Sequence, residues 1–456
     1  MNQAADATAR RVGSRSRVIL VAFHYHPDPA VGSLRARNAA QALAAAGHDV
    51  HVVCSAIDGA AADSFDGPVH VVRVTSGASP RDMLSGLKRV VAAARIRPEA
   101  RANKQEKSTG GESGWKAPQK VSVLRRWIGS VTWLPDDRQG FILPAARAAE
   151  HLMRGDGTDV LYTTAPPFSG HLVGLVLRLR ARFRWMLEFR DPWTDNTYKP
   201  WFVRSWLTDR LEIWAERRCL MQSDVIVTVT SAYADVLRTR HGPPIANKVI
   251  VARNGIPQIF SPTSSDTSRF RVVYAGTFYL RRDPNAFLTA LARVNQNASG
   301  RSRRLDVQFV GDCRNFDGEA LGPKIDTLGL SSIVTFVDWL PHADSVELMR
   351  SADLLLLFAQ DQPLAVPNKL YEYLGMGIPI LAFADDAGET ALLLRDIGGH
   401  FVITEKDGAE AIEKALMDAI DRAGSQETAS PGLQALATSI QMKTVTNWLD
   451  ATPVSA

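Results

Sequence analysis

The chain has 456 residues, of which 45% are apolar and 22% charged, and its formal net charge is +5. This balance excludes a disordered chain, which would have too few apolar residues, and a dedicated nucleic-acid binder, which would carry a denser basic stripe. At roughly 100–200 residues per domain, the length predicts two or three domains.

Three cysteines, Cys54, Cys219 and Cys313, lie far apart and form no CxxC pair. This pattern argues against a disulfide framework or a structural zinc site, and it favours a reducing compartment. The first apolar run, Val18–Phe23, is too short for a signal peptide or a membrane-spanning helix, and it follows a polar segment, 1–16, that we expect to be disordered. We therefore expect a cytoplasmic protein that contacts the inner face of the cell membrane at most peripherally.

The first domain is expected over residues 17–260, where short apolar runs alternate with helical stretches. The first helix is predicted over Ser33–Ala46, ending at Gly47. Strands that alternate with helices predict βαβ units, hence an α/β fold with a parallel sheet. The expected strands are Val18–Phe23, Asp49–Cys54, Val69–Val74, Asp159–Thr163, Trp185–Phe189 and Val225–Val229.

A polar, glycine-rich stretch interrupts this pattern over residues 98–120 and predicts a mobile loop. Residues 261–268, rich in Ser, Thr, Asp and Pro, are typical of a linker. A second α/β domain follows over 269–432, and a final helix is expected over 433–450. Helices are predicted in the second domain over Pro284–Gln296 and Asn368–Met376, and strands over Arg271–Ala275, Leu305–Val310, Ile333–Val337, Asp353–Phe358 and Pro379–Ala382.

The loop from His24 to Ser33 leads from the first strand into the first helix. Helix N-termini present free N–H groups that attract phosphate, and Gly32 would allow a ligand close to the backbone. The alternative is an ordinary βα turn with Ser33 as the N-cap residue. His24 and His26 lack the further ligands that a metal site needs, so we assign them loop or acceptor-side roles.

Arg190 and Asp191 follow a strand directly, at the carboxyl end where ligands bind in α/β sheets. Asp191 is a candidate for binding sugar hydroxyls or assisting a proton transfer, and Arg190 for pairing with an anion. We take both as catalytic candidates. The alternative is a structural ion pair that fixes the turn before Pro192.

The second domain opens with a strand, a turn at Gly276 and Thr277, and a helix with Asp283 as its expected N-cap. Arg281 and Arg282 lie just before this helix, and paired guanidinium groups suit a diphosphate. The alternative is a solvated charge pair.

The sharpest pattern is the short helix that Asn368 is expected to cap and Gly377 to end. Lys369 and Glu372 share one face near its N-terminus, three residues apart, with Leu370 between them. Lysine beside free N–H groups binds phosphate, and the carboxylate one turn later accepts hydrogen bonds from both ribose hydroxyls. The alternative is a surface ion pair of little energetic value.

Seven segments in this order resemble family 4 glycosyltransferases, and together they span the chain from about Arg17 to about Leu394. They are VILVAFHYHPDPAVGSLRARNAAQALAAAGHDVHVV, TTAPPFSGHLVG, LEFRDPW, CLMQSDVIVTVTS, VARNGI, VVYAGTFY and PNKLYEYLGMGIPILA.

The resemblance implies the GT-B fold: two facing Rossmann-like domains with parallel sheets and a C-terminal helix that crosses back to the first domain. It implies that the second domain holds the nucleoside diphosphate sugar, that the first binds the acceptor, that the sugar keeps its anomeric configuration, and that no metal or other cofactor is needed. Arg282 takes the place of the residue that holds the diphosphate, and Glu372 that of the residue that binds the ribose. Gly32 lies in the first-domain loop that approaches the phosphates.

Three positions depart from the family pattern. Leu364 stands where the first of two glutamates is usual, Thr277 where an arginine is usual, and Arg190 where a histidine is usual. These departures leave open which group contacts the transferred sugar.

We therefore expect a retaining glycosyltransferase that acts on a lipid-linked or polysaccharide acceptor and does not bind nucleic acid. Stabilisation of the leaving diphosphate by Arg282, Lys369 and helix N-termini would drive the reaction. Two alternatives remain open: a sugar-nucleotide epimerase of the same architecture, and an inactive sugar-nucleotide-binding scaffold, which Leu364 favours.

Three segments combine basic and apolar residues in a way that suits an anionic membrane surface. The alternative is that they are amphipathic helices packed on the sheet. They are Leu84–Arg97, Leu124–Leu134 and Trp201–Trp206.

Overall fold

The computed structural model describes residues 16–79, 133–155, 159–195, 205–260, 268–279, 282–297, 303–423 and 432–451. These residues form two compact units. The first contains the described chain up to Arg253 and again from Gln441, and the second runs from Asn254 to Ile440. The predicted loop 98–120, and all but the last residue each of segments 1–16 and 261–268, lie outside the described residues.

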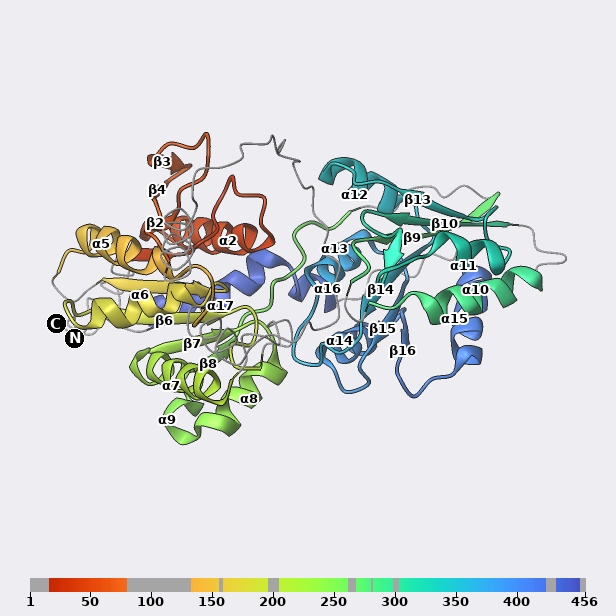
Figure 1. Cartoon of the computed structure of the whole chain (residues 1–456). Helices are drawn as coiled ribbons and strands as arrows, with labels where there is room; N and C mark the ends of the chain where they lie inside the picture. The colour runs from red at the N-terminus through yellow and green to blue at the C-terminus, as the bar shows by residue number, and fades with distance from the viewer. Residues whose placement is uncertain are drawn as a thin grey trace, which may run out of the picture. The chain divides into compact units, whose positions relative to one another are not determined.

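The first unit is built on an eight-stranded sheet in the order β3-β4-β2-β1-β5-β6-β7-β8. Figure 1 labels β3, β4, β2, β6, β7 and β8 of this sheet. All neighbouring strands are parallel except β3, which runs antiparallel to β4 at the edge. The predicted parallel α/β fold class is confirmed. The strands are β1 (Arg17–Val21), β2 (Asp49–Ser55), β3 (Asp63–Asp66), β4 (Val69–Val74), β5 (Val160–Ala165), β6 (Arg184–Phe189), β7 (Val225–Thr228) and β8 (Val249–Val251).

Helices cover both faces of this sheet. The buried residues of α2 recur at helical spacing as Ala36, Ala39, Ala40 and Leu43, and they pack against the strands. Among the described residues before Asn254, the helices are α2 (Val31–Ala45), η1 (Gln139–Phe141), α5 (Ile142–Leu152), α6 (Ser169–Arg178), α7 (Trp206–Gln222), α8 (Ser231–His241) and α9 (Pro243–Ala246).

The second unit repeats the design with a six-stranded, wholly parallel sheet in the order β13-β10-β9-β14-β15-β16. A small antiparallel hairpin, β11 (Asn315–Phe316) and β12 (Glu319–Ala320), lies outside it. The strands of the main sheet are β9 (Arg269–Ala275), β10 (Arg304–Val310), β13 (Val334–Val337), β14 (Leu354–Ala359), β15 (Ile380–Ala384) and β16 (Phe401–Ile403).

The final helix expected over 433–450 is two helices, α16 (Gly432–Ala435) and α17 (Thr438–Ala451). Most of α17 belongs to the first unit, where Met442, Val445 and Leu449 join the core, so the chain crosses back as expected. The other helices of the second unit are α10 (Asn285–Gln296), α11 (Gly322–Thr327), α12 (His342–Arg350), α13 (Asn368–Met376), α14 (Glu389–Ile397) and α15 (Ala409–Asp421).

Candidate functional site

The N-terminus of α13 carries the polar residues that the sequence singles out most sharply. The predicted bounds of α13 are correct, and Gly377 ends it in the left-handed region with φ 68°. The expected cap is wrong, because Pro367 is the N-cap residue and Asn368 is the first residue of the helix. Lys369 Nζ lies 2.9 Å from Glu372 Oε2, so these two side chains form an ion pair.

The turn after β9 lies at the same edge of the sheet as α13, since β9 and β14 are neighbours and both lead into loops there. The Gly276 N–H donates to Val310 O at 2.9 Å, and the Tyr274 hydroxyl donates to Thr277 O at 3.0 Å. The two bonds fix the turn at the carboxyl end of the strand, where ligands bind in α/β sheets.

Arg282 lies between this turn and α10. Its guanidinium carbon lies 4.5 Å from the centre of the Tyr279 ring, and its buried Nε has no hydrogen-bond partner among the described residues. The predicted cap of the helix is wrong by one residue: α10 begins at Asn285, and Asp283 Oδ1 accepts the N–H of Asn285 at 2.8 Å. Arg281 lies outside the described residues.

A pocket of about 370 Å³ opens beside Glu372 within the second unit. Its walls are mostly apolar and combine the segment after Asn254, the start of α12 and the face of α13 that carries Glu372. A mostly apolar cavity with a few polar groups is the usual form of a small-molecule site. The lining residues are Pro257, Gln258, Phe260, His342, Ala343, Val346, Glu347, Glu372 and Met376.

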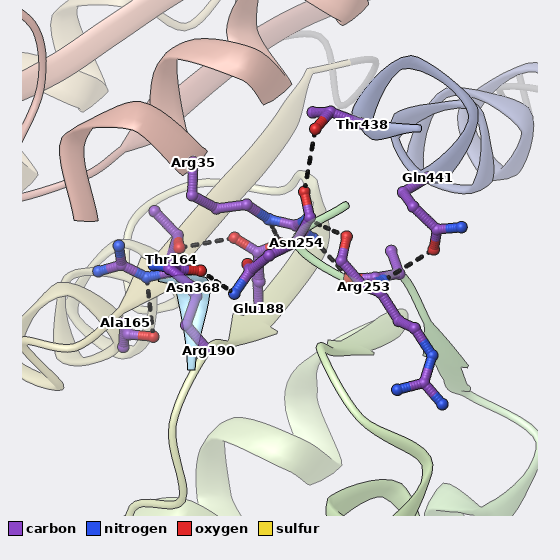
Figure 2. Close-up of polar contacts among 11 residues, drawn as sticks. Arg35, Thr164, Ala165, Glu188, Arg190, Arg253, Asn254, Asn368, Thr438 and Gln441 are labelled. Atoms are coloured by element: carbon purple, nitrogen blue, oxygen red, sulfur yellow. Dashed lines mark hydrogen bonds and ion pairs between the residues drawn. The ribbon is translucent and has the colours of Figure 1, made fainter. Parts of the chain in front are cut away.

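Both ends of α13 are tied to residues 254–260. At the N-terminal end, Asn254 Nδ2 donates to Asn368 Oδ1 at 2.6 Å (Figure 2). At the other end, Phe260 N–H donates to Gly375 O at 2.8 Å, and a Cβ on Gly375 would lie 2.1 Å from Gln258 O. The position of the proposed donor-binding helix therefore depends on the segment that enters the second unit.

In the first unit, the loop after β1 is held by its own polar groups. Asp28 Oδ2 lies 2.6 Å from His24 Nδ1, and Asp28 Oδ1 accepts the Ala30 N–H at 2.9 Å. The expected cap is wrong here too: α2 begins at Val31 with Ala30 as N-cap, and the Ser33 hydroxyl donates to Asp28 O at 2.6 Å. Ser33 therefore fixes the loop from inside the first helical turn.

The Arg190 guanidinium occupies the space that a side chain at position 32 would fill. A Cβ on Gly32 would lie 2.2 Å from Arg190 Nη1, so the absence of a side chain there makes room for the guanidinium. Arg190 also donates to Ala165 O at 3.3 Å through Nε and to Pro166 O through Nη2. Asp191 is exposed, and its carboxylate accepts no hydrogen bond among the described residues. The two predicted catalytic candidates therefore differ: backbone carbonyls hold the Arg190 guanidinium, whereas the Asp191 carboxylate is exposed.

A buried ion pair lies near Arg190, and the sequence did not predict it. Arg35 Nη2 lies 2.7 Å from Glu188 Oε1, and the Thr164 hydroxyl donates to Glu188 Oε2 at 2.6 Å (Figure 2). Burial alone would raise the pKa of Glu188, but Arg35 and Thr164 outweigh it and hold that pKa below its ordinary value. Arg35 also donates to Ala252 O at 2.8 Å and to Arg253 O at 2.6 Å, where the chain leaves the unit.

A second group that sequence reasoning missed is His171, which is fully buried on α6. Trp185 Nε1 donates to the Thr163 hydroxyl at 2.9 Å, and that hydroxyl lies 3.0 Å from His171 Nδ1. Burial, with a smaller effect of Arg190, lowers the pKa of His171 to about 3.

The predicted site residues therefore fall into two groups. Within the second unit, Gly276 and Thr277 follow β9 at the strand end that α13 contacts, where the Ala275 N–H donates to the Tyr373 hydroxyl at 3.1 Å, and Arg282 lies between this turn and α10. Within the first unit it brings together Gly32, Ser33, Arg190 and Asp191, because β1, β5 and β6 are neighbours.

Two protein families match the chain by sequence. Residues 32–255 match the glycosyl transferase 4-like domain, and residues 269–422 match the glycosyl transferases group 1. No curated protein sequence matches the chain.

Solved structures resemble nearly the whole chain. The sucrose-phosphate synthase of Thermosynechococcus elongatus has a TM-score of 0.60 at 16% identity, covering 96% of this chain and 100% of its own. Anabaena HepE in complex with UDP has a TM-score of 0.58 at 15% identity, with coverage of 96% and 100%. The α,α-trehalose 6-phosphate synthase of Burkholderia multivorans has a TM-score of 0.53 at 14% identity, with coverage of 96% and 98%. These likenesses concern the fold.

Proposed function

This chain belongs to the glycosyltransferase group 1 and 4-like family and has its GT-B fold, and on that premise we propose that it transfers a sugar from a nucleoside diphosphate sugar to an acceptor hydroxyl with retention of configuration. The acceptor in this proposal is lipid-linked or a polysaccharide, and no metal or other cofactor takes part.

The observation that carries the proposal is the arrangement in the second unit. The start of α13, with Lys369, offers free N–H groups and an ammonium to a diphosphate. Arg282 adds a guanidinium whose buried Nε lacks a partner among the described residues. Glu372 lies one turn along the helix and lines the pocket. Phosphate donors next to a carboxylate and an apolar pocket suit the three parts of a nucleoside diphosphate.

Lys369 and Glu372 carry the two charges that a nucleoside diphosphate can use at this helix. Each side chain is only partly exposed, at 30% and 23%. A nucleoside diphosphate would replace the pair with two better contacts, phosphate on Lys369 and ribose hydroxyls on Glu372. The structures of HepE with UDP and with UDP-glucose support a uridine nucleotide as the first donor to test.

The proposed reaction breaks the bond between the anomeric carbon and the diphosphate, whose oxygen keeps the electron pair. The acceptor hydroxyl attacks on the face from which the diphosphate departs and passes its proton to the leaving phosphate oxygen. Arg282, Lys369 and the N-terminus of α13 stabilise the developing negative charge. We assign Gly32 and Ser33 to the phosphates, and Arg190 and Asp191 to the acceptor side, where the open Asp191 carboxylate accepts a hydrogen bond from a sugar hydroxyl.

The test is a binding titration with a panel of nucleoside diphosphate sugars, using wild type and the variants Lys369→Ala, Glu372→Ala and Arg282→Ala. Loss of one charged contact to the donor should weaken binding by about tenfold or more. A matched control is Lys406→Ala, which breaks another lysine–carboxylate pair of the second unit, 2.6 Å from Asp386. The control should leave binding unchanged.

Activity assays then separate the alternatives. Transfer to an acceptor with retention, or hydrolysis of the donor in its absence, supports the proposal. Binding without either reaction would favour the inactive scaffold that Leu364 suggests, and interconversion of the donor sugar alone would favour an epimerase. If no nucleotide sugar binds to folded protein, the donor site is wrongly assigned.

A further inference from the structure

Helix α7 of the first unit buries two carboxylates while it exposes several large apolar side chains. Its buried residues are Thr208, Glu212 and Glu216, together with the apolar Cys219 and Leu220. Its exposed side carries four large apolar side chains: Trp206 is 74% exposed, Trp214 59%, Ile213 42% and Leu211 38%. A helix on the surface of a globular protein ordinarily turns its apolar face inward.

Internal partners account for part of the buried side. Glu216 Oε1 lies 3.0 Å from His241 Nε2 and 3.5 Å from Arg240 Nη1, and the Thr194 hydroxyl donates to the same carboxylate. The unit thus satisfies the buried charge. On the outer side the exposed apolar groups lie within about two helical turns of one another, and none of them is buried by the residues that the structure describes.

The charges around these apolar groups are mostly positive. Arg210, Arg217 and Arg218 are exposed on α7, whereas Asp209 is its only exposed acidic residue. The Arg218 guanidinium lies 6.0 Å from the centre of the Trp214 ring, within the range of a cation–π contact. Single exposed apolar residues need no explanation, but a cluster of them rimmed by charges marks an interaction site.

We propose that this outer face of α7, formed by Trp206, Arg210, Leu211, Ile213, Trp214, Arg217 and Arg218, binds the headgroup layer of an anionic lipid bilayer. Tryptophan favours the boundary between headgroups and acyl chains because its ring has an apolar body and a polar N–H. Arginines alongside it pair with lipid phosphates and are attracted by the negative surface potential.

The contact is peripheral: none of the helices in the described parts of the chain is long and apolar enough to cross a bilayer. Of the three basic and apolar segments noted in the sequence, Leu84–Arg97 and all but the last two residues of Leu124–Leu134 lie outside the described residues. Trp206 is the last residue of the third segment and begins α7. The proposal extends beyond sugar transfer and does not depend on it.

Vesicle flotation with the full chain tests the proposal. We expect strong binding to phosphatidylcholine vesicles with about 30 mol% phosphatidylglycerol, and at least about tenfold weaker binding to phosphatidylcholine alone. Binding should also weaken as salt is raised, because salt screens the attraction. The double variants Trp206→Ala/Trp214→Ala and Arg217→Glu/Arg218→Glu should each lower affinity by about tenfold or more.

Two matched controls lie elsewhere on the first unit. Phe65→Ala removes an aromatic that is 72% exposed on β3, and Arg147→Glu reverses an exposed charge on α5. Both should bind vesicles as wild type does, and thermal melting checks that every variant is folded. Equal binding to both kinds of vesicle, no binding at all, or equal loss in the controls overturns the proposal. So does a wild-type dimer that Trp206→Ala/Trp214→Ala converts to a monomer, since the face would then join two copies.

Discussion

At Gly32, a single hydrogen atom in place of a side chain decides where Arg190 lies. A methyl group there would lie 2.2 Å from Nη1 and 2.8 Å from Nη2, far inside contact distance. The guanidinium would have to leave its carbonyl partners Ala165 O and Pro166 O. The importance of Gly32 therefore has a steric cause inside the unit, apart from the predicted approach of a phosphate.

We predict that Gly32→Ala lowers the free energy of unfolding by about 1 kcal/mol, because the atoms that the methyl group meets end a flexible side chain and the main cost is the hydrogen bonds that Arg190 gives up. Urea unfolding measures it. Gly322→Ala is the control, because a Cβ at this first residue of α11 meets nothing within 4 Å. In an Arg190→Ala background the cost of Gly32→Ala should largely vanish; if it persists in full, the guanidinium is not its cause.

Loss of either partner of the Arg35–Glu188 ion pair should destabilise the first unit. Both residues are buried, Arg35 at 5% exposure and Glu188 at 0%, so removing one partner leaves an uncompensated charge. Arg35→Met alone should destabilise the protein by about 3–5 kcal/mol. Arg35→Met/Glu188→Leu should cost much less than the two single changes together, which a double-mutant cycle in urea measures. Additive losses would contradict this account.

The difference between Lys369–Glu372 and Arg35–Glu188 shows what a sequence reveals at this scale. Lys369 and Glu372 are three residues apart on one helix, so their contact follows from helical geometry. Arg35 and Glu188 are 153 residues apart, and only the order of strands brings them together. Gly32 and Arg190 are a similar case. The sequence predicted each of them as a site residue, but it did not predict that they contact each other.

The bounds of helix α13 follow from local sequence signals, whereas its N-terminal contacts depend on a residue far away in the sequence. The strand-to-helix pattern predicted its bounds, because the helical spacing and the glycine at its end are local signals. Its cap was wrong, because Asn368 makes its hydrogen bond with Asn254 rather than with its own helix. The predicted final helix is broken for a similar reason: Ala437 pairs with Ile256, and this tertiary contact separates α16 from α17.

The bond between Asn254 and Asn368 supports a prediction about donor binding. Asn254→Ala removes the 2.6 Å contact at the start of α13, and the helix N-terminus loses its anchor. We expect about three- to tenfold weaker binding of the nucleotide sugar, in line with one lost hydrogen bond. Titration calorimetry measures it.

The control is the corresponding change at the other residue of this hydrogen bond, Asn368. Asn368→Ala should have the same effect, and the double variant should be no worse than either single one, because one bond is lost in each case. Independent, multiplying losses would show that the two side chains act separately.

At the scale of the whole molecule, the chain crosses twice between the units, after Arg253 and before Gln441. Arg253 N–H donates to Gln441 Oε1 at 3.0 Å in the first unit, and the Thr438 hydroxyl donates to Asn254 O at 3.3 Å in the second (Figure 2). The alternation of strands and helices was enough to predict two parallel-sheet domains. The return of the final helix followed from the family resemblance, since an amphipathic helix alone does not say which core it joins.

Each unit holds a histidine whose surroundings disfavour the protonated ring, so acid tests the stability of both units. Burial lowers the pKa of His171 to about 3 and that of His400 to about 4, against an ordinary value of 6.5. His400 Nδ1 accepts the Ile380 N–H at 3.3 Å, which requires an unprotonated nitrogen. In the folded chain each of the two histidines therefore stays unprotonated at pH values below 6.5, at which the same histidine binds a proton in the unfolded chain.

The resulting stability is complete above pH 6.5. It is lost as the pH falls toward about 4 for His400 and about 3 for His171, by up to roughly 1.4 kcal/mol per pH unit for each histidine. His400→Gln removes the titrating group and keeps an oxygen that can accept the Ile380 N–H. Urea unfolding of wild type and His400→Gln at about pH 7 and about pH 5 should show a smaller acid-induced loss in the variant, confined to the transition of the second unit. Because His171 is unchanged, the first unit should lose as much stability as in wild type. Equal losses in the second unit with and without His400 would show that other groups govern its response to acid.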